Sequence, residues 1–128
     1  MKAALKISFL LAVIICGTIT CFGQIIGKVE IANEKLSQFQ NVRDFCISQN
    51  NDEIYFTLQS PFHEISQILH IKKLNGKWSD PTLMPFSDKF SDLEPFLSPD
   101  QTKLYFASNR PMNDSSITAK DYDTWYVK

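Results

Sequence analysis

The stretch SDLEPFLSPDQTKLYFASNRP, residues 91–111, holds a compact turn signal between two short apolar runs. Proline fixes φ near the value that the second position of a tight turn requires, so Pro99 suits that position. Ser98 comes before it and Asp100 after it, and both side chains can bond to nearby backbone. We therefore predict a tight turn at SPDQ with a strand on each side.

The run LYFAS after this turn is apolar and aromatic, as expected of a strand. Because side chains alternate across a strand, Tyr105 should face one way and Leu104 and Phe106 the other. We expect a short strand over 94–98 and a second strand over 103–108.

The same pattern occurs earlier in the chain. ISQNNDEIYFTLQS, residues 47–60, aligns with LSPDQTKLYFASNR, residues 97–110, at an offset of 50. QILHIKK, residues 67–73, resembles DTWYVK, residues 123–128, at an offset of 56, which indicates a longer loop in the second copy. Two copies of one unit indicate a repeat architecture.

Each copy is predicted to form a strand, a turn, a second strand, a loop and a third strand. In the first copy a fourth strand is expected near residues 78–84, where Pro81 and Pro85 suit an edge position. Four short antiparallel strands in about 50 residues is the size of a β-propeller blade, with a sandwich or meander as the alternative. The predicted fold is all-β: a partial β-propeller of about two four-stranded antiparallel blades, the second incomplete.

The second copy resembles the TolB-like, WD40-like β-propeller repeat. That pattern has an acid and proline, then Ser-Pro-Asp-Gly, an apolar-aromatic strand that ends near an arginine, and an aspartate before an aromatic third strand. The matching residues are Glu94, Pro95, Ser98, Pro99, Asp100, Leu104, Tyr105, Phe106, Arg110, Asp123 and Trp125. Gln101 departs from the pattern, since the family has glycine there. Because positive φ is less favourable for glutamine than for glycine, we expect a turn type that does not need glycine at this position.

The resemblance implies a propeller domain of the cell envelope that serves as a scaffold or a binding surface. The leading hypothesis is a binding module without catalytic activity of its own, whose partner is a protein or another envelope component. The alternative is the propeller part of a truncated envelope hydrolase, a peptidase or glycosidase, whose catalytic residues are absent from this chain. Fold alone does not decide between them.

Residues 1–23 have the layout of a secretory signal peptide. Lys2 and Lys6 precede a short apolar run, and small and polar residues lead to Gly23. The run is too short for a transmembrane helix, which needs about 20 apolar residues. A lipoprotein signal is the other alternative, but the residues before Cys21 do not fit one. We expect cleavage after Gly23, no transmembrane span thereafter, and an extracytoplasmic location, either periplasmic or secreted.

The domain boundaries follow from the repeat. Residues 24–41 form an N-terminal segment, 42–90 the first repeat and 91–128 the second, incomplete repeat. The segment before the repeats is either a strand that closes the last blade of a full-length propeller or a short helix around 33–39. Because repeat folds need three or more units, we expect a truncated propeller, or several chains that close one ring.

Several acids lie near landmarks of the repeat, namely Asp92, Glu94, Asp100, Asp121 and Asp123. Paired carboxylates serve glycosidases, but residues at fixed repeat positions are more often architectural. Asp100 is interpreted as a turn residue, and we expect Asp123 and Glu94 to hold loops or pair with Arg110. Asp121 and Asp123 are too generic a pair to indicate calcium, and His63 and His70 make a poor metal site. We predict no catalytic, cofactor or metal residues.

Two further features argue against a cysteine nucleophile and against nucleic-acid binding. Cys46 would be the single cysteine left after cleavage, and its apolar neighbours favour a buried, unreactive side chain. The net charge of the full chain is −1 at pH 7, and no basic run is present, so nucleic-acid binding lacks its electrostatic footprint.

Overall fold

The computed structural model describes residues 27, 28, 30, 31, 33–112 and 117–128. Contacts divide the chain into two units, residues 1–30 and 31–128. In the first unit, Lys28 Nζ and Glu30 Oε1 form an ion pair at 2.8 Å. The predicted signal peptide lies outside the described residues and stays a prediction.

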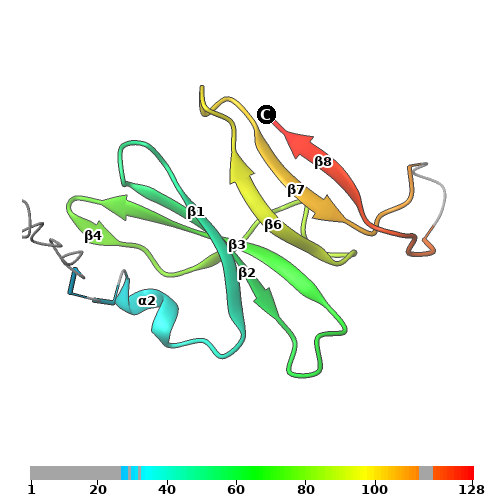
Figure 1. The fold of residues 1–128 in the computed structure, drawn as a ribbon, viewed down its shortest axis with the longest axis horizontal. Coiled ribbons are helices and arrows are strands. Elements are labelled where there is room, and N and C mark those ends of the chain that lie inside the picture. Colours follow the sequence, from blue (N-terminus) through cyan, green and yellow to red (C-terminus); the bar gives the residue numbers. More distant parts are fainter. Residues whose placement is uncertain (1–26, 29, 32, 113–116) are drawn as a thin grey trace, which may run out of the picture. The chain divides into compact units, whose positions relative to one another are not determined.

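The strands of the first repeat form one antiparallel sheet (Figure 1). Its strands are β1 (Val42–Ile47), β2 (Glu53–Gln59), β3 (Ser66–Leu74), β4 (Lys77–Trp78) and β5 (Thr82–Leu83). They follow the order β1-β2-β3-β4, and β5 pairs with β3 beside β4.

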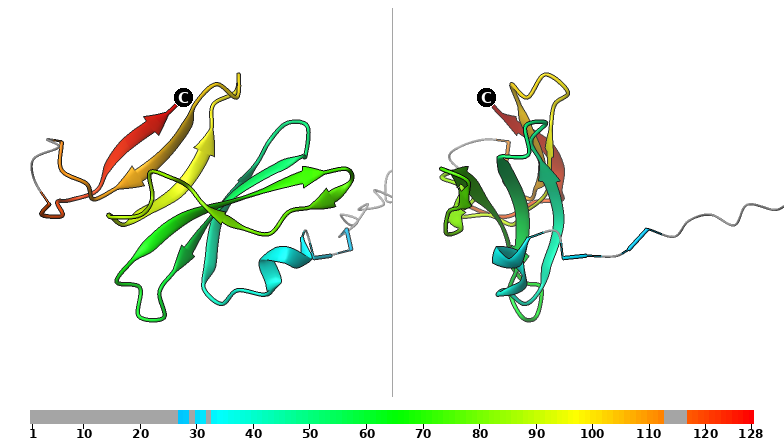
Figure 2. Two further views of the ribbon diagram at one scale, coloured as in Figure 1. Left: turned by 180° about the vertical axis from the view of Figure 1, so that it is seen from behind. Right: turned by 90° about the vertical axis from the view of Figure 1, so that its left-hand side faces the viewer.

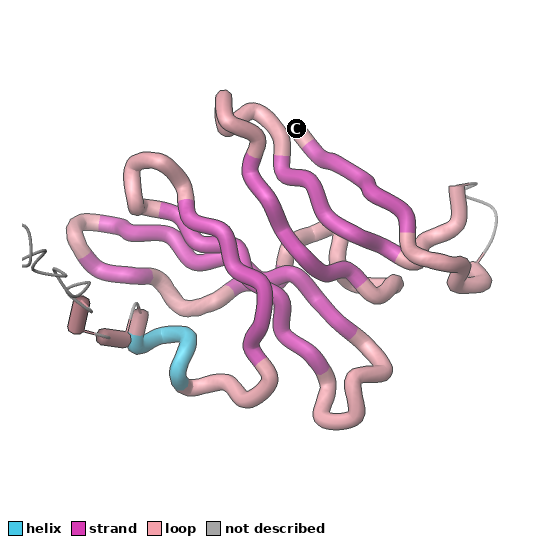
Figure 3. Tube along the Cα trace, viewed as in Figure 1, coloured by secondary structure: helices cyan, strands magenta, loops and turns pink. Residues whose placement is uncertain are grey.

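The strands of the second repeat form a separate sheet of three antiparallel strands in the order β6-β7-β8. These are β6 (Asp92–Leu97), β7 (Leu104–Ser108) and β8 (Asp123–Val127). Within the described residues of the second unit, the helical element is α2 (Glu34–Ser37), a single turn (Figure 3). The all-β class is confirmed, and neither sheet closes on itself.

The fourth strand expected near residues 78–84 is split in two. Leu74 and Lys73 pair with β4, and His70 and Leu69 pair with β5. Between the two pieces lie Ser79, Asp80 and Pro81. Since proline has no N–H to donate to a ladder, the pairing is interrupted beside Pro81. Ser79 fills part of the gap, because its N–H donates to the Lys72 carbonyl at 2.7 Å.

One face of the first sheet packs against α2, as Figure 2 shows from two sides. The buried side chains of this face are Ile54, Phe56, Leu69 and Ile71. Leu36 of the helix and Phe39 just after it cover them, with the Phe39 and Phe56 ring centroids 6.0 Å apart. The short helix therefore exists because it covers apolar surface, since a single turn has little stability of its own.

Asn33 begins the helix as its N-cap, and its Oδ1 accepts a hydrogen bond from Lys35 N at 2.8 Å. This agrees with the helix that was the alternative for the N-terminal segment. Residues 27, 28, 30 and 31 are described and lie outside any strand. A closure strand in a longer relative therefore stays a prediction.

The opposite face of the first sheet packs against the second sheet, whose strand β6 lies against β1, β2 and β3. Ile68 and Thr57 are fully buried there. Thr57 Oγ1 accepts a hydrogen bond from the backbone N–H of Glu94 at 3.2 Å. Ser66 N donates to Ser91 Oγ at 2.8 Å, so polar contacts also join the two sheets.

The predicted alternation in the second sheet is confirmed. Leu104 and Phe106 are buried, while Tyr105 is half-buried on the other face. Leu104 lies with Leu97 and Tyr55 around a small cavity of about 130 Å³ between the sheets. The face of β7 that carries Leu104 and Phe106 is therefore the one turned toward the first sheet.

Both predicted turns form, and they share one hydrogen-bond pattern. Asn51 N donates to the Ser48 carbonyl at 2.9 Å, and Gln101 N donates to the Ser98 carbonyl at 2.8 Å. The hydroxyl of each serine also accepts from the backbone, Ser48 from Glu53 N and Ser98 from Lys103 N, both at 3.0 Å. Asp100 Oδ1 accepts from the Ser98 hydroxyl at 2.5 Å.

The turn forms without glycine, but Gln101 adopts the positive φ that is unfavourable for this residue. Its φ is +58°, and Asn51 at the same position of the first repeat has φ +55°. The equivalent positions of the two repeats therefore share the left-handed conformation. A hydrogen bond from Gln49 N to Gln101 Oε1 at 2.8 Å gives the glutamine side chain a role that glycine could not fill.

A β-bulge also recurs at the offset of 50. The pairing of β1 with β2 shifts register between Arg43 and Phe45, and that of β6 with β7 shifts between Leu93 and Phe96. Asp44, at the first shift, has φ +45°, and Glu94, at the second, has φ +57°. The acid of the repeat motif thus occupies a bulge, an irregularity that bends a strand and increases its twist.

Asn51 offers a test of the left-handed turn. Asn51→Ala should be less stable than Asn51→Gly by about 1 kcal/mol, because a Cβ disfavours positive φ. Urea unfolding followed by circular dichroism would measure the difference. Asn50, which does not have positive φ, is the matched control, and there the glycine variant should be the less stable. The same order at both positions would contradict the assigned conformation.

Candidate functional site

Arg110 joins three segments around the second sheet. Its Nη2 contacts both carboxylate oxygens of Asp92, at 2.8 and 2.9 Å, and donates to the Phe86 carbonyl at 3.0 Å. Its Nε donates to Ser108 Oγ at 2.8 Å. Asp92 and Ser108 are fully buried. The arginine thus ties β6, the end of β7 and the segment before β6, as expected of a residue that holds neighbouring loops.

Aromatic rings surround the same guanidinium. Its Cζ lies 5.0 Å from the ring centroid of Phe106, 5.7 Å from that of Trp125 and 5.9 Å from that of Phe86. Phe86 and Phe106 stack at 4.5 Å. Cations over ring faces gain electrostatic energy, more so when shielded from water. The aromatic rings therefore pack around an arginine of the same chain, and the cluster stabilises the fold.

The acid that Arg110 binds is Asp92, whereas Glu94 and Asp123 were expected to be its partners. The exposed carboxylate of Glu94 lies 3.8 Å from Arg43 Nη2. Asp123 begins β8, opposite Ser108, and is exposed. Asp92 and Glu94 are two residues apart and would share a face of an unbroken strand. The register shift between Leu93 and Phe96 separates them, so that Asp92 is buried opposite Ser108 while Glu94 is exposed. Alternation along an unbroken strand does not predict that difference.

The two turns of the repeats also bind each other. Besides the bond to Gln101, Gln49 donates through Nε2 to the Pro99 carbonyl at 2.7 Å. Gln49 and Pro99 occupy the same position of their repeats. The joint between the sheets therefore includes a direct contact between equivalent turns.

The remaining motif residues complete this architecture. Pro95 is buried beside the bulge. Tyr105 lies on the outer face of the second sheet, 5.7 Å from the Tyr126 ring. Trp125 pairs with Phe106 across β7 and β8.

A polar cluster lies where the first sheet meets the second. The rings of Tyr55 and His70 stack at 4.6 Å. Glu53 accepts a hydrogen bond from the Tyr55 hydroxyl at 2.7 Å and pairs with Lys72 at 2.7 Å. His70 Nε2 is buried without a hydrogen-bond partner in the described structure and is 3.8 Å from Glu53.

Burial is the largest single influence on the pKa of His70, Tyr55 and Glu53. It lowers the pKa of His70 because the charged imidazolium would lose water, while Glu53 acts in the opposite direction. Burial also raises the pKa of Tyr55, and the Glu53 carboxylate adds to that effect. Burial tends to raise the pKa of Glu53 too, but hydrogen bonds from Lys72 and Tyr55 outweigh it and lower the pKa. At neutral pH the cluster holds an uncharged His70 beside the Glu53 carboxylate, whose charge is balanced by Lys72.

Cys46 is a half-buried free thiol, and burial raises its pKa. A thiol with a raised pKa is a poor nucleophile at neutral pH. Across the described residues, no group of three or more His, Cys, Asp or Glu side chains is placed to hold a metal ion. That part of the chain also contains no helix with the length and apolar character needed to span a bilayer.

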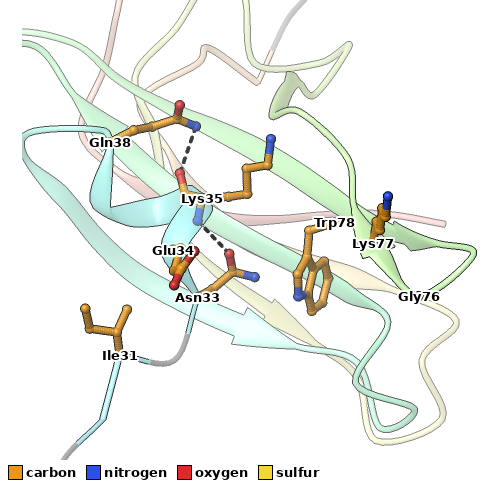
Figure 4. Close-up of a pocket in the computed structure, with 8 residues that line it drawn as sticks. All are labelled: Ile31, Asn33, Glu34, Lys35, Gln38, Gly76, Lys77 and Trp78. Carbon is orange, nitrogen blue, oxygen red and sulfur yellow. Dashed lines mark hydrogen bonds between the residues drawn. The ribbon is translucent and has the colours of Figure 1, made fainter.

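A surface pocket of about 670 Å³ lies between α2 and the β3–β4 hairpin (Figure 4). The side chains and backbone that line it come from the N-terminal segment and from the hairpin. They are Ile31, Asn33, Glu34, Lys35, Gln38, Gly76, Lys77 and Trp78. None of these residues belongs to the repeat motif, so the repeat comparison could not have found the pocket. The one sequence signal is Asn33 as a helix cap.

Comparison with known proteins gives no match to a family model, to a curated protein or to a solved structure.

Removing the charge at Arg110 should destabilise the protein strongly. Arg110→Ala leaves Asp92 buried and unpaired, and breaking a buried ion pair costs about 3 kcal/mol or more. The urea midpoint of the variant would measure the loss. Arg43→Ala is the control, because the Arg43 pairs with Asp44 and Glu94 are exposed and such pairs contribute little. Equal midpoints for the parent and Arg110→Ala would contradict the role of this residue.

His70 should make stability depend on pH below neutrality. Its pKa is lower in the folded state than in the unfolded state, where it is near 6.5. The unfolded chain therefore binds a proton first as pH falls, and stability decreases from about pH 6.5 downward until the folded pKa is reached. Urea unfolding at pH 7.5 and in steps to pH 5.5 would measure the slope. His70→Gln should flatten it, and an unchanged slope would assign the effect to another group.

Proposed function

We propose that this chain is a β-propeller-type repeat scaffold that acts outside the cytoplasm as a non-catalytic binding module. The observation that carries the proposal is that the two sheets meet through non-equivalent faces. The face that the first sheet buries at this contact is open to solvent in the second sheet, and side chains that the second sheet buries on its other face are exposed in the first.

The face of the first sheet that meets the second sheet carries the row Cys46, Tyr55 and His70, which pair across β1, β2 and β3. These side chains are half-buried. The equivalent row of the second sheet is Phe96, Tyr105 and Tyr126, which pair across β6, β7 and β8.

That second row is open. Phe96 is 60% exposed and Tyr126 51% exposed. Lys103 Nζ lies 4.8 Å from the centroid of the Tyr126 ring. Adjacent exposed aromatic side chains on a sheet indicate a surface for interaction.

The complementary surface lies on the other side of the first sheet. Phe45 and Ile47, near the edge of the α2-covered face, are 55% and 42% exposed. Their equivalents in the second sheet, Pro95 and Leu97, are buried and half-buried. Leu97 contributes to the cavity between the sheets. The contact between the sheets therefore joins two different faces, the Tyr55 face of the first sheet and the Leu97 face of the second.

Such a head-to-tail contact is heterologous, and repetition of it produces a ring when the rotation closes. The resemblance of residues 91–128 to the TolB-like repeat supports a propeller as that ring. The signal-like N-terminus supports export. Within the described residues, the buried carboxylate of Asp92 pairs with Arg110 and the half-buried carboxylate of Glu53 pairs with Lys72. Both pairs serve packing, which favours a scaffold over a hydrolase.

An appended repeat tests this proposal. Since Tyr126 aligns with His70, Lys128 corresponds to Lys72, and a second copy of residues 73–128 joined after Lys128 continues the repeat in register. The added sheet should cover Phe96 and Tyr126. We expect a higher melting temperature than that of the parent and a larger denaturant m-value, because more surface is buried in one cooperative unit.

The control carries Phe96→Lys and Tyr126→Lys in both the parent and the extended chain. These charges should abolish the gain from the added repeat while changing the parent little, because both side chains are mainly exposed. An extended chain that melts in two separate transitions, with its first at the temperature of the parent, would overturn the proposal.

A further inference from the structure

We propose that the pocket between α2 and the β3–β4 hairpin binds one sugar unit of a neutral saccharide. The inference is independent of the repeat scaffold, because the pocket involves neither the second sheet nor the open rows of the two sheets. Its volume of about 670 Å³ is within the range of small-ligand sites.

Asn33 provides the first indication. The residue is 7% exposed, and Oδ1 is used for the helix cap. Its Nδ2 has no hydrogen-bond partner among the described residues. A buried donor without an acceptor costs free energy, so a ligand oxygen at this point would satisfy a group that the described residues leave unsatisfied. In Figure 4 the carboxamide points toward the indole of Trp78 across the pocket.

Trp78 provides an aromatic wall. The indole is half-buried and packs against the core of the first sheet, which holds it in place. A tryptophan combines a large apolar ring face with one N–H donor. The C–H face of a pyranose ring suits such a surface, while its hydroxyls bond to polar groups at the edge.

The charges of the pocket favour a neutral ligand. Lys35 Nζ is already paired with Asp80 Oδ1 at 2.6 Å. Of the other two charged residues that line the pocket, Glu34 is acidic and Lys77 basic. An anion would meet the carboxylate of Glu34, and a cation would meet Lys77, so neither is favoured overall.

The polar lining favours hydroxyl groups over an apolar ligand. Gln38 uses Nε2 to donate to the Lys35 carbonyl at 2.8 Å, so its Oε1 is the side-chain atom left to accept. Glu34 also accepts, whereas Asn33 and Lys77 donate. Hydroxyls both donate and accept, and a sugar carries several of them around an apolar ring face. The mixture of donors, acceptors and one indole therefore matches a saccharide.

Nuclear magnetic resonance can test this on the full chain. The sequence contains two tryptophans, so the ¹H–¹⁵N spectrum has two indole N–H signals, and Trp125 is a built-in reference. Cellotriose, maltotriose, xylotriose and N,N′,N″-triacetylchitotriose would be titrated separately to about 10 mM, which detects millimolar dissociation constants. At least one should shift the Trp78 indole and Asn33 side-chain signals in a saturable manner and leave the Trp125 indole unmoved.

Two variants separate binding from folding. Asn33→Ser keeps a side-chain oxygen for the helix cap but removes the carboxamide donor, and Trp78→Phe keeps an aromatic ring but removes the N–H. Each should weaken binding about fivefold or more, the value of one hydrogen bond. Trp125→Phe is the matched control and should bind as the parent does.

Melting temperatures near that of the parent would show that the variants are folded. Three results would overturn the proposal. They are the absence of a saturable shift with all four saccharides, equal shifts at both indoles, and parental affinity in both Asn33→Ser and Trp78→Phe.

Discussion

The packing of β6 across the first sheet is the constraint on which the rest of this structure depends. A sheet has two faces, and each must be covered or remain as apolar surface in water. The first sheet has α2 over part of one face and the second sheet over the other. The second sheet is covered on one face, and its aromatic row is left to solvent. Stability and the capacity for interaction therefore come from one arrangement.

Polar groups at the joint decide how the two sheets meet. Hydrophobic burial does not specify orientation, but hydrogen bonds do. The Thr57, Ser91 and Gln49 side chains contact backbone of the opposite repeat. Arg110 holds the segment that leads into β6 through the Phe86 carbonyl. Because a buried donor or acceptor without a partner is costly, these contacts exclude packings in which the sheets slide past each other.

The sequence was sufficient for the class, the positions of the first three strands of each repeat and the inward face of β7, because alternation and turn residues are local signals. The bulge at Glu94 and the left-handed Gln101 were not predictable in this way, since each depends on contacts far along the chain. Asp92 was among the acids noted, yet its partnership with Arg110 requires the bulge. The pocket at Trp78 depends on a helix that packing stabilises, and the repeat pattern gives no information about it.

The contact between Gln49 and the turn at Pro99 affects how a further sheet could pack against the second one. Pro99 occupies the position of Gln49 in the second repeat, but it has neither a backbone N–H nor a side-chain donor. The hydrogen bonds that Gln49 donates between the two sheets therefore cannot be repeated by Pro99 at the outer side of the second sheet. A further sheet on that side would therefore be held by a different set of hydrogen bonds, which would distinguish it from the second sheet.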